Sequence, residues 1–195
     1  MPKWLNIPNL FTLLRLALAP FVIREILLGH HLLALELFSI AAVTDALDGE
    51  LARRFRATTA AGAYLDPIAD KCLLSGVFLA QAISRILPWW LVVLIFARDL
   101  YILAGAAWFL IYTRQRRFPP SRWGKLSTFV QIATAVIWMG QSALSIPLLK
   151  ALAPVTIWPC AAITVWSGLD YTYRGIQLAR SKGDEANREP AGKAH

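Results

Sequence analysis

Charged residues are scarce in this chain of 195 residues, and cysteine is nearly absent. Asp, Glu, Lys and Arg make up only 16% of the sequence, against roughly 25% in a typical soluble domain. The hydrophobic fraction is 57%, which excludes an ordinary soluble domain. The two cysteines, Cys72 and Cys160, fall in apolar segments, where packing explains them better than a disulfide. A cleavable signal peptide is not expected, because the first apolar run is too long for one.

The apolar residues are gathered in runs long enough to cross a bilayer, which takes about 20 helical residues. We therefore predict an all-α integral membrane protein with six transmembrane helices. The predicted spans are 8–29, 32–53, 62–84, 88–112, 124–146 and 151–175. Residues 1–180 are predicted to form one membrane domain, and the polar residues 181–195 a disordered cytoplasmic tail.

The basic residues are concentrated on one side of these predicted spans. With an even number of spans, both termini share a side with the connections at 53–61 and 113–124. The basic residues of these segments are Lys3, Arg53, Arg54, Arg56, Arg114, Arg116, Arg117, Arg122, Arg180, Lys182, Arg188 and Lys193. By the positive-inside rule, both termini of this multi-pass cell-membrane protein are predicted to be cytoplasmic. The net charge of +8 reflects this asymmetry, and nucleic acid is not an expected partner.

Four aspartates interrupt the apolar sequence at fixed spacing. The pattern is Asp45-x2-Asp48-Gly49-x2-Ala52-Arg53-x8-Gly62-x3-Asp66-x3-Asp70. A carboxylate in hydrocarbon is costly, so an aspartate inside a membrane span indicates a functional site. Four such carboxylates need a shared counter-charge, and a divalent cation is the simplest candidate. Helix-terminal aspartates that face water and bind nothing are the alternative.

The spacing places the aspartates on two helix faces. Asp45 and Asp48 are three residues apart, whereas Asp66 and Asp70 are four apart, so each pair shares a face of its helix. The short connection between the second and third spans makes them antiparallel neighbours, and all four carboxylates are expected to meet near the cytoplasmic surface. Oxygen ligands alone favour Mg²⁺ or Mn²⁺ over zinc. Four carboxylates can bind two such ions about 3.5–4 Å apart, an arrangement that binds phosphoryl oxygens.

This motif resembles the signature of the CDP-alcohol phosphotransferase family, the membrane enzymes of phospholipid synthesis. The resemblance covers roughly residues 6–175 and includes the opening Asn6-Ile7-Pro8-Asn9 with Thr12 and Arg15. It implies six transmembrane helices, a homodimer, and a cytoplasmic site that binds CDP-diacylglycerol through two divalent ions. The implied reaction displaces CMP from the CDP-linked lipid with an alcohol.

The resemblance also assigns roles to individual residues. Asp45, Asp48, Asp66 and Asp70 are implied metal ligands, and Asp70 is also the implied catalytic base. The implied CDP-binding residues are Asp48, Gly49, Ala52, Arg53, Thr58 and Gly62. The resemblance implies that Arg53 reaches phosphate and that Thr58 contacts cytosine.

The acceptor is expected to bind through two cationic residues. Arg98 and Asp99 lie near the middle of the predicted fourth span, where a charge must be paired or face a wet cavity. An Arg98–Asp99 pair is one interpretation, but adjacent helical residues point in different directions, which favours Arg98 facing an acceptor phosphate. Lys125 begins the predicted fifth span and resembles a lysine of the glycerophosphate-using enzymes. A snorkelling interfacial lysine is its alternative interpretation.

These two cations favour sn-glycerol 3-phosphate as the acceptor. The segment 66–71 is similar to phosphatidylglycerophosphate synthases and to the related cardiolipin synthases. The former usually have Arg-Glu where this chain has Arg98-Asp99, so phosphatidylglycerol is the alternative acceptor. Near the end of the sixth span, Asp170 and Arg174 are predicted to form a local pair.

Two other functional classes are compatible with clustered aspartates. A membrane prenyltransferase also uses paired Asp motifs to bind Mg²⁺ and a diphosphate, but it usually needs more spans and more widely separated motifs. A divalent-cation carrier would use the carboxylates for transport, but it leaves Gly49, Arg53 and Gly62 without a role. CMP release distinguishes the phosphotransferase from both.

Overall fold

In the described part of the chain the structure is all-α, with six helices in the order predicted from the apolar runs. The computed structural model describes residues 7–55, 60–113 and 122–188; within these helices the side chains of 7–12, 45–55, 60–68, 106, 109–113 and 178–188 are not described. The helices are α1 (Ile7–Leu27), α2 (His31–Phe55), α3 (Ala60–Ile83), α4 (Trp89–Thr113), α5 (Arg122–Ala143) and α6 (Pro147–Arg188). The first five agree with the predicted spans to within a few residues.

Helix α6 differs from the prediction because it is much longer than a single span. It continues for 42 residues and ends at Arg188, so 181–188 are helical although the composition predicts a disordered tail from 181. The sequence after 175 contains no proline before Pro190, and its Ala, Arg, Lys and Glu residues favour a helix. Residues 189–195 lie outside the described part of the chain.

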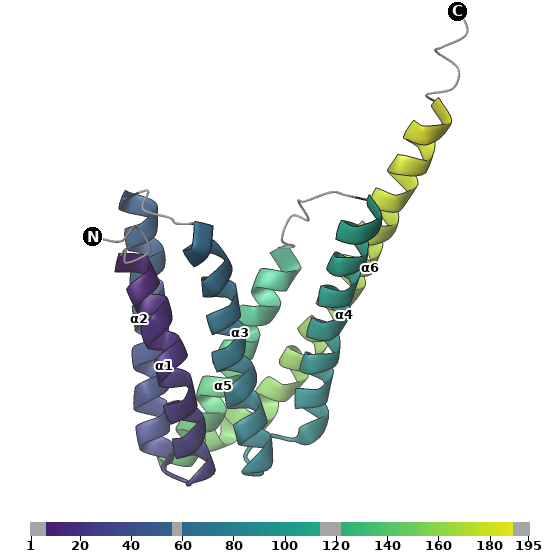
Figure 1. Cartoon of the computed structure of the whole chain (residues 1–195). Coiled ribbons are helices and arrows are strands. Elements are labelled where there is room, and N and C mark those ends of the chain that lie inside the picture. Colours follow the sequence, from purple (N-terminus) through teal and green to yellow (C-terminus); the bar gives the residue numbers. More distant parts are fainter. Residues whose placement is uncertain (1–6, 56–59, 114–121, 189–195) are drawn as a thin grey trace, which may run out of the picture. The chain divides into compact units, whose positions relative to one another are not determined.

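The helices form two compact units, one of Met1–Val92 with Ile132–Ile157 and the other of Val93–Gln131 with Trp158–His195. In the first unit, α1 packs against both α2 and α3, and the three helices lie side by side (Figure 1). Val22 and Ile26 of α1 and Val77 and Phe78 of α3 are fully buried or nearly so. Because α2 and α3 carry the aspartate motif, α1 joins the two halves of the candidate site.

The connection between α1 and α2 is fixed by a buried glutamate. Gly29 has a φ of 80° and turns the chain, a conformation that glycine adopts without strain. Glu25 is 5% exposed; its carboxylate accepts a hydrogen bond from Arg24 Nη1 at 2.5 Å and lies 2.7 Å from His30 Nδ1. This ionic cluster secures the end of α1 opposite the aspartate motif.

Helices α1 and α3 approach each other closely at Gly76. A Cβ atom built there would lie 2.3 Å from Cδ1 and 3.0 Å from Cγ1 of Ile23. We expect Gly76→Val to lower the free energy of unfolding by about 1–3 kcal/mol, because two branched side chains would compete for one space. Thermal unfolding in detergent measures the effect. Gly175→Ala is the control, since nothing lies within 4 Å of that position; an equal loss in both variants would contradict the prediction.

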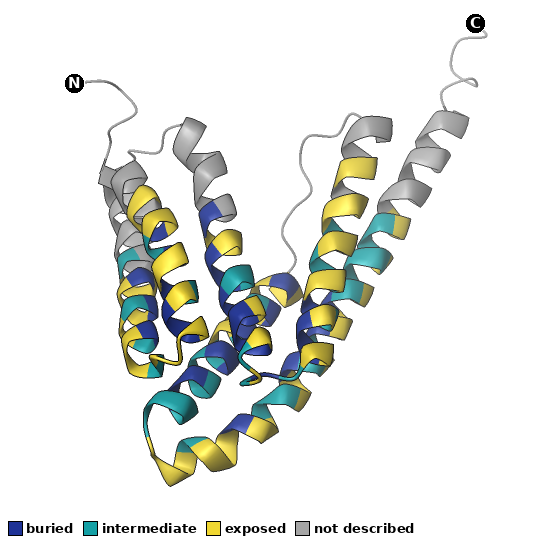
Figure 2. Cartoon of the chain, turned by 60° about the horizontal axis from the view of Figure 1, so that its bottom comes forward, coloured by how far each residue is buried: buried dark blue, intermediate teal, exposed yellow. Residues whose placement is uncertain are grey.

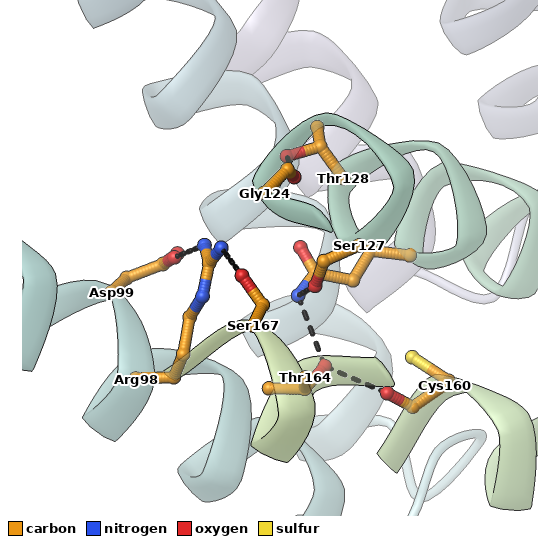
Figure 3. A network of polar contacts seen from close by, with 9 residues as sticks. Arg98, Asp99, Gly124, Ser127, Thr128, Cys160, Thr164 and Ser167 are labelled. Atoms are coloured by element: carbon orange, nitrogen blue, oxygen red, sulfur yellow. Dashed lines mark hydrogen bonds and ion pairs between the residues drawn. The ribbon is translucent and has the colours of Figure 1, made fainter. Parts of the chain in front are cut away.

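The second unit contains the later part of α4, the first part of α5 and the later part of α6. Its interior is polar for an apolar chain. Gln131 is fully buried and donates to both Ser127 Oγ and Thr164 Oγ1 at 3.3 Å, while Thr164 donates to the Cys160 carbonyl at 2.7 Å. Figure 3 shows this chain of contacts between α5 and α6. In an apolar environment such bonds specify how two helices pack.

Large apolar side chains are exposed on all six helices. Each helix carries both buried and exposed residues along its described length (Figure 2). Among the described residues, one segment, Pro147–Gln177, passes a test of length and apolar composition for a membrane-crossing helix. The six-span topology predicted from the whole sequence is therefore kept as a proposal.

Candidate active site

The aspartate motif lies on two helices that meet α1. Residues 45–53 of the motif are on α2, while Gly62, Asp66 and Asp70 are on α3. Of the four aspartates, Asp70 alone has a described side chain. The structure does not describe the side chains of five other motif residues, which are Asp45, Asp48, Ala52, Arg53 and Asp66. Thr58 lies outside the described residues. The helical backbone nevertheless supports the three- and four-residue spacings that pair the aspartates.

The last aspartate of the motif, Asp70, forms an ion pair that joins α3 to α1. Arg15 Nη1 donates to Asp70 Oδ1, joining residues 55 apart in the sequence. The two side chains differ sharply in exposure, since that of Arg15 is 2% exposed and that of Asp70 is 50% exposed. The guanidinium therefore sits in the helix interface, and the carboxylate remains accessible from outside the packed helices.

Local packing explains the position of Asp70. Its neighbours Ala69 and Leu73 are 2% and 6% exposed and form the buried face of α3. Asp70 and Lys71 are exposed, which places them at the border between the packed face and the outside. Arg15 belongs to the motif that opens the chain, but the sequence alone indicates no partner for it. Its position within an apolar helix was the available signal, because a charge there needs a counter-charge.

The second unit contains a separate cationic centre at Arg98. Its Nη1 donates to Asp99 Oδ1 at 2.9 Å and its Nη2 donates to Ser167 Oγ of α6 (Figure 3). The guanidinium carbon also lies 5.9 Å from the centre of the Tyr171 ring. Adjacent residues thus do pair here, contrary to the geometric argument from the sequence. Neither Ser167 nor Tyr171 was singled out in the sequence, because an uncharged residue on an apolar helix gives no signal.

Arg98 lies close to the first turn of α5. A Cβ atom at Gly124 would lie 3.5 Å from Arg98 Nη2 and 3.3 Å from the Tyr171 hydroxyl, so glycine allows this approach. Lys125, the next residue, is exposed. The structure therefore brings Arg98 against the helical turn that contains Lys125. The side chain of Arg98 is only 9% exposed, and two of its five N–H donors have partners in the described part of the chain.

Comparison with known proteins identifies the family of this chain. The family model for CDP-alcohol phosphatidyltransferases matches residues 5–166, most of the chain and all of the aspartate motif. The chain belongs to this family. It is therefore a membrane-associated enzyme that transfers a substituted phosphate group from a CDP-linked alcohol, and the resemblance inferred from the motif is confirmed.

Individual relatives carry names that refine the comparison. A probable phosphatidylglycerophosphate synthase of Mycobacterium tuberculosis is 36% identical over 88% of this chain and 82% of its own length. A CDP-diacylglycerol–glycerol-3-phosphate 3-phosphatidyltransferase of Pectobacterium atrosepticum is 33% identical over 85% of this chain and 92% of its own. A probable CMP-forming cardiolipin synthase of Drosophila melanogaster is 32% identical over 70% of this chain and 47% of its own length.

Enzymes of this phosphatidyltransferase family generally use divalent metal ions. The described part of the chain contains no group of three or more possible metal-binding residues, as expected when only one motif aspartate is included. The carboxylate of Asp70 fits a hard cation, because it is a half-exposed oxygen ligand on the same helix as Asp66. The ligands predicted from the sequence are Asp45, Asp48, Asp66 and Asp70.

Proposed function

We propose that this enzyme transfers the phosphatidyl group of CDP-diacylglycerol to the hydroxyl of sn-glycerol 3-phosphate and releases CMP. Family membership supports phosphatidyl transfer over the prenyltransferase and cation-carrier alternatives. The observation that carries the choice of acceptor is Arg98, a nearly buried guanidinium held against the turn that contains Lys125. A phosphorylated acceptor offers the anionic oxygens that such a cation binds best.

The proposed chemistry assigns Asp70 to the acceptor hydroxyl. Its carboxylate takes the hydroxyl proton as the acceptor oxygen bonds to the phosphorus that carries diacylglycerol. The bond from that phosphorus to the bridging oxygen breaks, and CMP leaves with the oxygen and its electron pair. Bound divalent ions would neutralise the charge that develops on the diphosphate.

The remaining motif residues are proposed to bind the nucleotide. Arg53 binds phosphate, and Asp48, Ala52 and Thr58 line the CDP site. Gly49 and Gly62 leave room for the ligand, because a side chain at either position would occupy that space. We further propose six spans with both termini in the cytoplasm, an active site at the cytoplasmic face, and a homodimer. The charge asymmetry of the connections supports this orientation.

The acceptor is tested with purified full-length protein in detergent, supplied with CDP-diacylglycerol and Mg²⁺. We expect CMP and phosphatidylglycerophosphate when sn-glycerol 3-phosphate is added. CMP and cardiolipin with phosphatidylglycerol alone would establish the alternative acceptor, which the Arg98-Asp99 sequence and the fly relative favour. No product with either acceptor would contradict both.

Arg98 should determine how tightly the acceptor binds. We expect Arg98→Met to raise KM for sn-glycerol 3-phosphate by about 10–100-fold, the effect of losing one charge-assisted hydrogen bond, with KM for CDP-diacylglycerol little changed. Initial rates of CMP release over a range of each substrate provide both constants. Arg174→Met is the matched control, because Arg174 belongs to the same unit and pairs with Asp170 at 2.8 Å. An unchanged KM for the acceptor in folded Arg98→Met would refute this role.

A further inference from the structure

Among the side chains that the structure describes in the first unit, Arg15 is the most deeply buried charged one, and the proposed reaction gives it no part. It lies in the middle of α1 and is 1% exposed, whereas the flanking Leu14 and Leu16 are each 41% exposed. Helix α1 therefore directs a cation into the protein and its leucines outward. A guanidinium buried without a counter-charge costs several kcal/mol, so the partner it selects is informative.

Among the described side chains, Arg15 pairs with Asp70, the proposed catalytic base. The guanidinium contacts Asp70 Oδ1 from the buried side, while half of the carboxylate side chain is accessible. A carboxylate has two oxygens and can accept several hydrogen bonds at once, so contact with Arg15 does not prevent Asp70 from acting on a ligand. The cation lies on the buried side of the carboxylate, which leaves the accessible side for a ligand.

The helices that carry the two residues are firmly joined. On the C-terminal side of the ion pair in both helices, Gly76 of α3 lies against Ile23 of α1. At the far end of α3, Ser84 Oγ donates to the Ile26 carbonyl at 3.3 Å. Because α1 and α3 are fixed along this length, Arg15 can restrain the side-chain rotation of Asp70 rather than follow it.

We propose that Arg15 is a positioning residue that holds the Asp70 carboxylate in the orientation needed to accept the acceptor proton. The inference rests on the proposed function, since it assumes that Asp70 is the base. A purely structural Arg15 would support the α1–α3 interface but would leave the turnover of folded enzyme unchanged. The two roles therefore differ in kcat per folded molecule.

The test compares three variants of the full-length enzyme by steady-state CMP release. In Arg15→Met we expect kcat to fall about 10–100-fold, as when a supporting residue of an active-site ligand is lost, with both KM values little changed. In Arg15→Lys we expect an intermediate kcat, because a lysine keeps the charge but lacks the planar guanidinium. Glu25→Gln is the matched control: it removes another buried charge from α1 at the end away from Asp70 and should keep the wild-type kcat.

A second measurement, independent of turnover, tests the pair itself. Thermal unfolding in metal-free buffer should show that Arg15→Met and Asp70→Asn each lower Tm. The double variant should lose clearly less than the sum of the two, since each residue is the other's partner. Additive losses would show that the two side chains are not coupled and would overturn the proposal.

A wild-type kcat in folded Arg15→Met would also overturn the proposal that Arg15 positions Asp70. A variant in which KM rises and kcat stays unchanged would overturn it too. If Arg15→Met does not fold, Arg15→Lys decides, and a wild-type kcat in that variant counts against the proposal. If the wild-type enzyme releases no CMP, the proposed function itself fails. The unfolding measurement then still decides whether Arg15 and Asp70 act as a pair.

Discussion

Asp70→Asn is expected to lower kcat for CMP release by about 100- to 10,000-fold, the usual contribution of a positioned acid–base group. Asparagine has nearly the same shape, but it cannot accept the hydroxyl proton and is a poorer ligand for a hard cation. The measurement is CMP release at saturating CDP-diacylglycerol and sn-glycerol 3-phosphate, expressed per folded enzyme.

The correction for folded enzyme is necessary because Asp70 is also the counter-charge of buried Arg15. Without its carboxylate the variant should lose stability as well as turnover. Asp170→Asn is the matched control, because it removes a carboxylate that is also bonded to an arginine, at 2.8 Å from Arg174. A folded Asp70→Asn enzyme with more than a tenth of wild-type kcat would exclude Asp70 as the base.

Removal of divalent ions is expected to stop CMP release completely and reversibly. The diphosphate of the lipid substrate is strongly anionic, and the carboxylates of the motif would repel it without bound cations. Dialysis against a chelator followed by titration with Mg²⁺ or Mn²⁺ measures the requirement. Either ion should restore activity, because both are bound by oxygen ligands.

Variants of the motif extend this metal experiment. Asp66→Ala should need more Mn²⁺ for half-maximal activity than the wild-type enzyme, and Asp99→Ala should not, since Asp99 lies outside the motif and pairs with Arg98. Full activity after exhaustive chelation would contradict a metal-dependent mechanism. An equal metal requirement in the Asp66 variant would remove that residue from the proposed ligand set.

The number and order of the described helices could be predicted from sequence because the apolar runs are separated by charged residues, proline or, between the first two, Gly29-His30-His31. The end of α6 could not, since helix propensity and apolar character are different properties: the helix continues through polar residues to Arg188. The local Asp170–Arg174 pair was predicted and is confirmed at 2.8 Å, because contacts four residues apart depend only on helix geometry.

The candidate site was predictable to the extent that it depends on local spacing. Helical periodicity places the aspartates on shared faces, but the partner of Asp70 comes from α1, and that pairing depends on how α1 is rotated against α3. Likewise, Arg98 meets Ser167 and Gly124 only because three helices pack around it. The acceptor role of Arg98 and Lys125 remains a prediction.

The most direct test of the central claim is the stoichiometry of the reaction catalysed by the purified wild-type enzyme. CDP-diacylglycerol, sn-glycerol 3-phosphate and Mg²⁺ are supplied, and CMP and lipid products are quantified together by chromatography and mass spectrometry. We expect CMP and phosphatidylglycerophosphate in equal amounts, with neither formed when the acceptor is omitted. CMP formed together with phosphatidic acid in the absence of acceptor would instead show hydrolysis by water and would contradict phosphatidyl transfer to an alcohol.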